Sequence, residues 1–202
     1  MKDDLKKDST SNNMKKTIIT SILSTVLFCS VIAQTTINGV TLSPKIAPAK
    51  TELILNGGGV RTKFFMKVYV AGLYLQTKSN KPKEIIEADK PMSVRIHIIS
   101  NLMTSANMAT AIREGFEKST KGNVAPFQKE IDLICTIFQS DIIKIGDLFE
   151  IYYVPGVGVR CFKNGKDQKV CMSGLAFKKA LFGIWFSEDP VDENLKKGML
   201  GL

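Results

Sequence analysis

Residues Leu55–Leu75, LNGGGVRTKFFMKVYVAGLYL, combine three consecutive glycines with an arginine and a long apolar run. Glycine has no Cβ, so it allows backbone conformations and close contacts that other residues do not tolerate. We therefore expect Gly57, Gly58 and Gly59 to form a bend or bulge that orients the residues after them. The first charged side chain after these glycines is Arg61.

The run that follows Arg61 has the alternation of a β-strand. Every even position from Phe64 to Val70 is apolar and the odd positions are mixed, which predicts a strand with one face in a core; the even residues are Phe64, Met66, Val68 and Val70. The opposite face carries Arg61 and Tyr69. A straight strand separates these two residues by about 26 Å, at about 3.3 Å per residue. They can reach one ligand only if the chain bends or folds back.

The rest of the chain predicts blocks of strands and blocks of helices. Such blocks are typical of an α+β domain rather than of a βαβ repeat. The sequence predicts strands at 37–42, 52–55, 92–100, 147–154, 157–162 and 168–172, and helices at 82–88, 105–116, 127–138, 177–185 and 190–200, with Thr104 or Ser105 and Asp192 as N-caps. In the strand at 92–100, apolar residues alternate with Arg95 and His97.

Residues 1–33 have the features of a secretory signal peptide. Two lysines precede an apolar run of roughly 16 residues that ends at Ala33, and a membrane-spanning helix needs roughly 20. We expect cleavage after Ala33, which leaves residues 34–202 as the mature domain of an exported protein, periplasmic or secreted. Both Met1 and Met14 remain possible starts, because Met14 opens a more usual signal sequence.

The chain is basic, with a formal net charge of +9. Removal of residues 1–33 takes away five lysines and three aspartates, which leaves +7. This charge is compatible with anionic partners, such as a small anionic ligand or an anionic membrane surface, but a merely solvated basic surface is the more common meaning of such a charge. Nucleic acid is disfavoured, because an exported protein rarely meets it and no basic run is interleaved with aromatic residues.

Export would place Cys135, Cys161 and Cys171 in an oxidising compartment. Cys161 and Cys171 flank a turn, so a disulfide between them depends on the turn type. A two-residue turn at Asn164–Gly165 puts them on opposite faces of the hairpin, with Cys161 facing Gln168, whereas a three-residue loop puts them on one face. The disulfide status of these cysteines therefore remains open.

Arg61 is the strongest candidate for a binding residue. Beside a glycine bend, its guanidinium could clamp a carboxylate or enolate oxygen bidentately, and Tyr69 would add a hydroxyl donor. A surface arginine with a structural tyrosine is the alternative. We predict no cofactor and no metal, because the glycine run lacks the phosphate-binding fingerprints and His97 is the only histidine.

Three segments resemble the chalcone isomerase-like superfamily, in particular its exported bacterial branch. They are GGGVRTKFFMKVYVAGLYLQ (57–76), YYVPGVGVRCFKNGK (152–166) and AFKKALFGIWFSEDPVDENLKKGMLG (176–201), and the resemblance extends over nearly all of 36–202. It implies an open-faced β-sandwich, in which helices cover one face of a curved antiparallel sheet and a ligand cleft lies between them. Non-catalytic plastid members bind fatty acids through an Arg and a Tyr at the positions of Arg61 and Tyr69.

The same resemblance indicates whether this protein binds a ligand or catalyses a reaction, because the binding and the catalytic members differ at the site residues. Plant isomerases, which close a chalcone into a flavanone, have threonine at the position of Tyr69, and their site helix carries Tyr and Lys that 103–116 lacks. We therefore expect an exported protein that binds a small amphipathic anion such as a fatty acid, with Arg61 and Tyr69 on its head group. The alternatives are an isomerase or intramolecular lyase acting on an unsaturated carbonyl compound, with Arg61 as its catalytic residue, and a non-binding scaffold.

Overall fold

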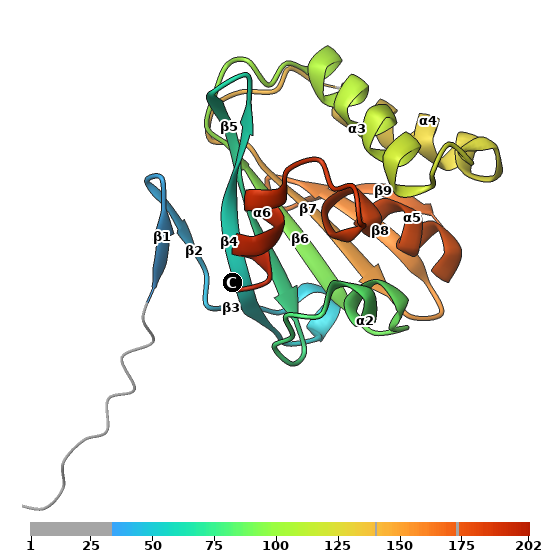
Figure 1. The fold of residues 1–202 in the computed structure, drawn as a ribbon, viewed down its shortest axis with the longest axis horizontal. Coiled ribbons are helices and arrows are strands. Elements are labelled where there is room, and N and C mark those ends of the chain that lie inside the picture. Colours follow the sequence, from blue (N-terminus) through green and yellow to red (C-terminus); the bar gives the residue numbers. More distant parts are fainter. Residues whose placement is uncertain (1–33, 140, 173) are drawn as a thin grey trace, which may run out of the picture. The chain divides into compact units, whose positions relative to one another are not determined.

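The computed structural model describes residues 34–139, 141–172 and 174–202. In this part of the chain, a curled seven-stranded antiparallel sheet runs in sequence order from β3 to β9 (Figure 1). Its strands are β3 (Lys45–Ile46), β4 (Leu53–Lys63), β5 (Met66–Leu75), β6 (Met92–Ile98), β7 (Leu148–Val154), β8 (Gly158–Lys163) and β9 (Lys166–Met172). The predicted signal segment lies outside the described residues, and the domain boundary after Ala33 stays a prediction.

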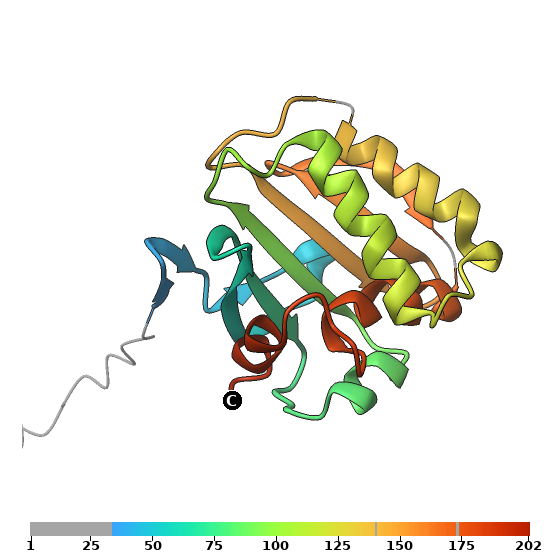
Figure 2. The same ribbon diagram turned by 45° about the horizontal axis from the view of Figure 1, so that its top comes forward.

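The helices lie mainly on one face of this sheet (Figure 2). They are α2 (Pro82–Glu87), α3 (Ser105–Ser119), α4 (Gln128–Gln139), α5 (Leu175–Phe186) and α6 (Glu193–Met199), with short 3-10 turns at Pro48–Lys50 and Ala125–Phe127. Thr104 caps α3 and Asp192 caps α6, each by accepting a backbone N–H. This arrangement confirms the predicted α+β open-faced β-sandwich.

Two apolar clusters hold the sheet, one on each face. The larger one lies between the sheet and the helices, and the smaller one packs beneath the short strands that precede the sheet. In β6, Val94, Ile96 and Ile98 belong to the larger cluster, as the alternation predicted. On the opposite face, Arg95 forms an ion pair with Glu150 of the neighbouring strand.

The predicted single strand after Arg61 is wrong, because the chain reverses at Phe64 and Phe65. Lys63 pairs with Met66, so these two phenylalanines form a two-residue hairpin loop between β4 and β5. Both have positive φ, 49° and 65°, which is the pattern of a type I′ turn. Phe64 is 84% exposed and Phe65 is fully exposed, so Phe64 does not contribute the core contact that the alternation indicated.

The predicted strand at 37–42 is also a hairpin. β1 (Thr35–Ile37) and β2 (Val40–Leu42) pair across Asn38 and Gly39, whose φ values of 47° and 79° suit a tight turn. An Asn-Gly pair is the residue pair that such turns prefer. In this segment, the turn preference of Asn38–Gly39 therefore predicts the structure better than the hydrophobic alternation does.

The hairpin of β8 and β9 begins at the expected Asn164–Gly165 turn, since Lys163 pairs with Lys166. Phe162 pairs with Asp167, as a two-residue turn predicts, but the register shifts between Arg160 and Phe162, and beyond the shift Arg160 pairs with Cys171. Cys135 and Cys161 are buried thiols. The side chain of Cys171 lies outside the described part of the structure.

Within the described ranges, no helix combines the length and the apolar character needed to cross a membrane.

The Phe64–Phe65 loop yields a stability prediction. A bulky residue held at positive φ costs about 1–3 kcal/mol, whereas Asn-Gly adopts this turn readily. We expect Phe64→Asn combined with Phe65→Gly to raise the free energy of unfolding by at least about 1 kcal/mol. Urea denaturation followed by circular dichroism measures this difference, and a less stable double variant would contradict the turn assignment.

Candidate functional site

The reversal at Phe64–Phe65 brings the two candidate residues together. Arg61 on β4 and Tyr69 on β5 are direct cross-strand partners. Side chains of such partners share one face of the sheet, with Cβ atoms about 4.5–5.5 Å apart. The separation of about 26 Å that a straight strand would impose therefore does not arise.

A β-bulge shapes the same hairpin. The pairing passes from Arg61–Tyr69 to Thr62–Lys67, which leaves Val68 as an extra residue on β5. Neighbours on a regular strand point to opposite faces, but a bulge redirects one of them. Val68 and Tyr69 both line the same cavity.

The glycines of β4 permit close packing of α6 against the strand. A Cβ atom added to Gly57 would lie 2.3 Å from the backbone oxygen of Gly198, and one added to Gly198 would lie 2.6 Å from the backbone oxygen of Gly58. Gly59 faces Leu195 of the same helix at 3.2 Å. Side chains at these positions would hold the helix away from the sheet.

A bulge at Asn56 precedes the glycines, since the register shifts between Leu55 and Gly57. The Asn56 side chain is buried and donates 2.9 Å hydrogen bonds to the carbonyl oxygens of Ser79 and Met199. Its own oxygen accepts the backbone N–H of Ser79 at 2.8 Å. Asn56 thus ties the end of α6 to the segment that follows β5.

The N-terminus of α6 surrounds Arg61. The guanidinium donates to the carbonyl oxygen of Val191, and its Nη1 lies 3.9 Å from Oδ2 of Asp192. The Asp192 carboxylate also accepts the backbone N–H groups of Thr62 and Leu195, each at 3.0 Å. Asp192 is therefore fixed by backbone donors on both sides, and the side chain of Arg61 is only 13% exposed.

A cavity of about 270 Å³ lies between the sheet and α3, α4 and α5. Its exposed lining residues, among them Phe64 and Leu102, mark its mouth near the β4–β5 loop, whereas Phe138 and Ile151 lie buried inside. The lining residues are Arg61, Lys63, Phe64, Met66, Val68, Tyr69, Ile96, Leu102, Met103, Asn107, Met108, Ala111, Ile112, Ile134, Phe138, Ile151, Leu181, Ile184, Trp185 and Val191.

The polar groups of this lining are few, and its charges have one sign. Among the described residues, Arg61 and Lys63 are the only charged side chains of the lining, and both are cationic. Tyr69 is buried, and its Oη accepts a hydrogen bond from Nε1 of Trp185 at 3.2 Å. Burial raises the pKa of Tyr69, although the nearby Arg61 and the bond from Trp185 oppose this rise. The hydroxyl is therefore neutral at physiological pH and keeps its proton to donate.

The sheet, the helices on one face and the cavity between them define an open-faced β-sandwich with an internal cavity. Residues 34–201 match the sequence profile of the family described as chalcone isomerase-like, so the chain belongs to this family, as the resemblance predicted. No protein with a curated description matches the chain in sequence.

A solved structure shares this fold. The crystal structure of a fatty-acid binding protein from Arabidopsis thaliana is similar over 83% of this chain and 96% of its own, with a TM-score of 0.67 and 13% sequence identity. At this identity the similarity establishes the fold.

The sequence predicted Arg61 and Tyr69 as site residues, which the structure places side by side, but it did not point to three residues around them. Asp192 was predicted as a helix cap, and its place beside Arg61 was not. Trp185 ends the helix predicted at 177–185, but its hydrogen bond to Tyr69 was not predicted. The sequence did not predict that Lys63 lines the cavity, because this position depends on the reversal of the chain at Phe64 and Phe65.

The packing of α6 on the glycines can be tested through stability. Overpacking of a tight contact costs about 1–3 kcal/mol. We expect Gly57→Ala to lower the free energy of unfolding by at least about 2 kcal/mol, since its Cβ would overlap backbone atoms. Gly59→Ala should cost less, because its contacts at 3.2 Å include a flexible leucine side chain. Equal losses in urea denaturation would contradict this account.

Proposed function

We propose that this protein binds a fatty acid, or a similar amphipathic carboxylate, in the cavity between the sheet and the helices. One observation carries the proposal: Arg61 and Tyr69 lie side by side in an otherwise largely apolar cavity whose charged lining residues are all cationic. A cavity of this kind suits a ligand with one anionic end and one apolar end.

The head group would bind at Arg61 and Tyr69. Arginine has five N–H donors in a fixed planar fork, and one of its nitrogens is engaged by Val191. The remaining donors can bind a carboxylate through charge-assisted hydrogen bonds. Tyr69 accepts from Trp185, so its own proton is directed to a further acceptor such as a carboxylate oxygen.

The tail would occupy the apolar interior. A volume of about 270 Å³ corresponds to roughly nine groups the size of a water molecule, at about 30 Å³ each. A methylene group is similar in size to a water molecule, so the cavity suits an alkyl chain of medium length. The buried side chains of Ile134, Phe138 and Ile151 would contact this chain.

Family membership is consistent with this function. The similar Arabidopsis thaliana structure is that of a fatty-acid binding protein. Its likeness in fold supports a lipid-like ligand for this chain, and the named side chains of the cavity supply the chemistry that such a ligand requires.

The cavity favours binding over the isomerase alternative. A catalysed cyclisation needs groups that exchange a proton near neutral pH. Arginine keeps its proton, and burial raises the pKa of Tyr69 further above neutrality. Helix α3 contributes Asn107 and apolar residues to the lining rather than a Tyr or Lys. A scaffold without a ligand is disfavoured as well, because side chains leave the cavity unfilled.

Substitution of Arg61 tests the proposed head-group contact. Hydrogen bonds to charged groups contribute about 1.5–3 kcal/mol, so Arg61→Ala should weaken the binding of decanoic acid by this amount. Tyr69→Phe should cost less, because it removes one neutral donor. Isothermal titration calorimetry measures both effects, and circular dichroism establishes that the variants are folded.

Arg113→Ala is the matched control for this titration. Arg113 is half exposed, pairs with Asp132 at 2.8 Å and does not line the cavity. Its loss removes one positive charge while the cavity stays intact, so affinity should remain within about twofold of the wild type, as for a surface charge. Equal affinities of Arg61→Ala and the wild type would overturn the assignment of Arg61 as the anchor.

We also propose that the protein is exported and that cleavage follows Ala33. The proposal rests on the two lysines and the apolar run of residues 15–33, which are typical of a signal peptide. N-terminal sequencing of the protein from its native host should give Gln34 as the first residue. An intact N-terminus at Met1 or Met14 would contradict export by this route.

A further inference from the structure

The mouth of the cavity carries an exposed apolar cluster, here called the tip: Phe64, Phe65 and Met66 at the β4–β5 loop, with Leu102 after β6. Their exposed fractions are 84%, 102%, 48% and 43%. Soluble proteins seldom expose adjacent large apolar side chains unless the patch meets a partner or a membrane. Phe64, Met66 and Leu102 also line the cavity, so the tip and the cavity mouth are one surface.

The backbone at the tip is unfavourable for the residues that occupy it. Both Phe64 and Phe65 have positive φ, which is a rare conformation for a bulky side chain. Neither residue compensates for it by packing in the core, since both are exposed. Such strain persists mainly where function requires it. The folded domain by itself would favour Asn-Gly at these positions.

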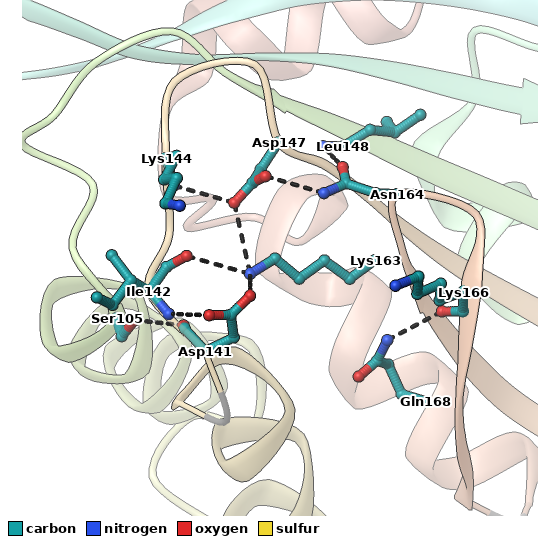
Figure 3. A network of polar contacts seen from close by, with 10 residues as sticks. All are labelled: Ser105, Asp141, Ile142, Lys144, Asp147, Leu148, Lys163, Asn164, Lys166 and Gln168. Carbon is teal, nitrogen blue, oxygen red and sulfur yellow. Dashed lines mark hydrogen bonds and ion pairs between the residues drawn. The ribbon is translucent and has the colours of Figure 1, made fainter.

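Further apolar residues lie at the same end of the sheet. The loop between α4 and β7 exposes Ile142 and Ile145, at 71% and 55%, and both ribbon views place this loop at the end of the sheet that carries the β4–β5 loop. Lys163 fixes the loop, because its Nζ contacts the Ile142 carbonyl oxygen and the carboxylates of Asp141 and Asp147 (Figure 3). These contacts of Lys163 fix the backbone of the loop on which the two exposed isoleucines lie.

Lysines flank the tip. Lys63 directly precedes Phe64, Lys67 follows Met66, and exposed Lys144 lies on the neighbouring loop. Lys63 has Glu114 at 3.8 Å, and the Nζ of Lys67 donates a 2.9 Å hydrogen bond to Oδ1 of Asn38, so lipid phosphates would compete with these partners. Both loop aspartates contact Lys163. Long lysine side chains can lie along an apolar surface while their ammonium groups reach the charged layer above it.

We propose that the tip inserts into an anionic phospholipid bilayer. Phe64 and Phe65 enter the acyl boundary, and Lys63 and Lys67 contact lipid phosphates, where each lysine is attracted by the negative surface. The cavity mouth then opens at the level of the head groups, so an amphipathic ligand can pass between bilayer and cavity without crossing bulk water. This docking goes beyond the proposed function and does not depend on it.

The shape of the tip favours a bilayer over a protein partner. A stable protein interface buries about 1,200–2,000 Å² across well-packed, complementary surfaces. The β4–β5 loop has only two residues and lies at the end of the sheet, beside the loop that leads from β6 to α3 (Figure 1). It can be covered completely by immersion in lipid, which needs no complementary pocket, and the surrounding lysines match anionic head groups.

Vesicle sedimentation tests the docking with protein that begins at Gln34, because the apolar run before Ala33 would bind lipid by itself. This protein contains the whole described fold. It should sediment with vesicles of phosphatidylcholine mixed with phosphatidylglycerol, and less with pure phosphatidylcholine. Added salt should weaken the binding, since it screens the lysines. No fatty acid is added, so failure of ligand binding would not affect the result.

The variant Phe64→Asn with Phe65→Gly should reduce the vesicle partition coefficient at least tenfold while its melting temperature does not fall. Val157→Ser is the matched control, because Val157 is 52% exposed in the β7–β8 turn at the opposite end of the sheet. It should bind as the wild type does. Binding of the double variant at wild-type strength, or no binding by the wild type, would overturn the proposal.

A second measurement distinguishes lipid insertion from self-association. The indole introduced by Phe65→Trp should shift its emission to shorter wavelength with anionic vesicles and be quenched by brominated lipids, whereas one introduced by Val157→Trp should not. A dimer that forms without lipid and is lost on Phe64→Asn with Phe65→Gly would instead make the tip an interface between two copies, and would overturn the bilayer assignment.

Discussion

The site depends on one contact, the close approach of the α6 backbone to β4 at Gly57 and Gly198. A Cβ atom on either glycine would overlap backbone of the other element, so this spacing is available to glycine alone. It places Asp192, at the start of α6, within reach of Thr62 and Arg61 on the strand. The glycines, which we expected to form a bend or bulge, therefore act mainly by permitting close packing. Arg61 is held by Val191, which lies just before α6 and 130 residues further along the chain.

The hairpin at Phe64–Phe65 is the second requirement, because it alone makes Arg61 and Tyr69 neighbours. The bulge at Val68 then aims two consecutive side chains of β5 at the cavity. A turn with better local chemistry would give the same pairing at a lower conformational cost. Local turn chemistry therefore does not explain why phenylalanine occupies both positions.

Much of the fold could be predicted from local patterns. The caps Thr104 and Asp192, the alternation in β6 and the Asn164–Gly165 turn are signals that a few neighbouring residues determine. The reversal at Phe64 could not be predicted in this way, because phenylalanine has no preference for turns and the even positions stay apolar through the loop. Lys178 is a similar case: this fully buried lysine donates to three carbonyl oxygens at the end of α2, an arrangement that exists only in the folded chain.

The same distinction applies to the candidate site. Arg61 and Tyr69 suggested from the sequence that an anion could bind. The charges around these two residues, however, depend on contacts between distant parts of the folded chain. Asp192 partly compensates Arg61 in the cavity, yet its carboxylate is held by the N–H groups of Thr62 and Leu195. A carboxylate arriving from the cavity side would therefore find the remaining guanidinium donors open, while Asp192 stays on its backbone donors behind them. If the cavity binds an anion as proposed, Asp192 can keep its hydrogen bonds to Thr62 and Leu195, so α6 need not leave the sheet.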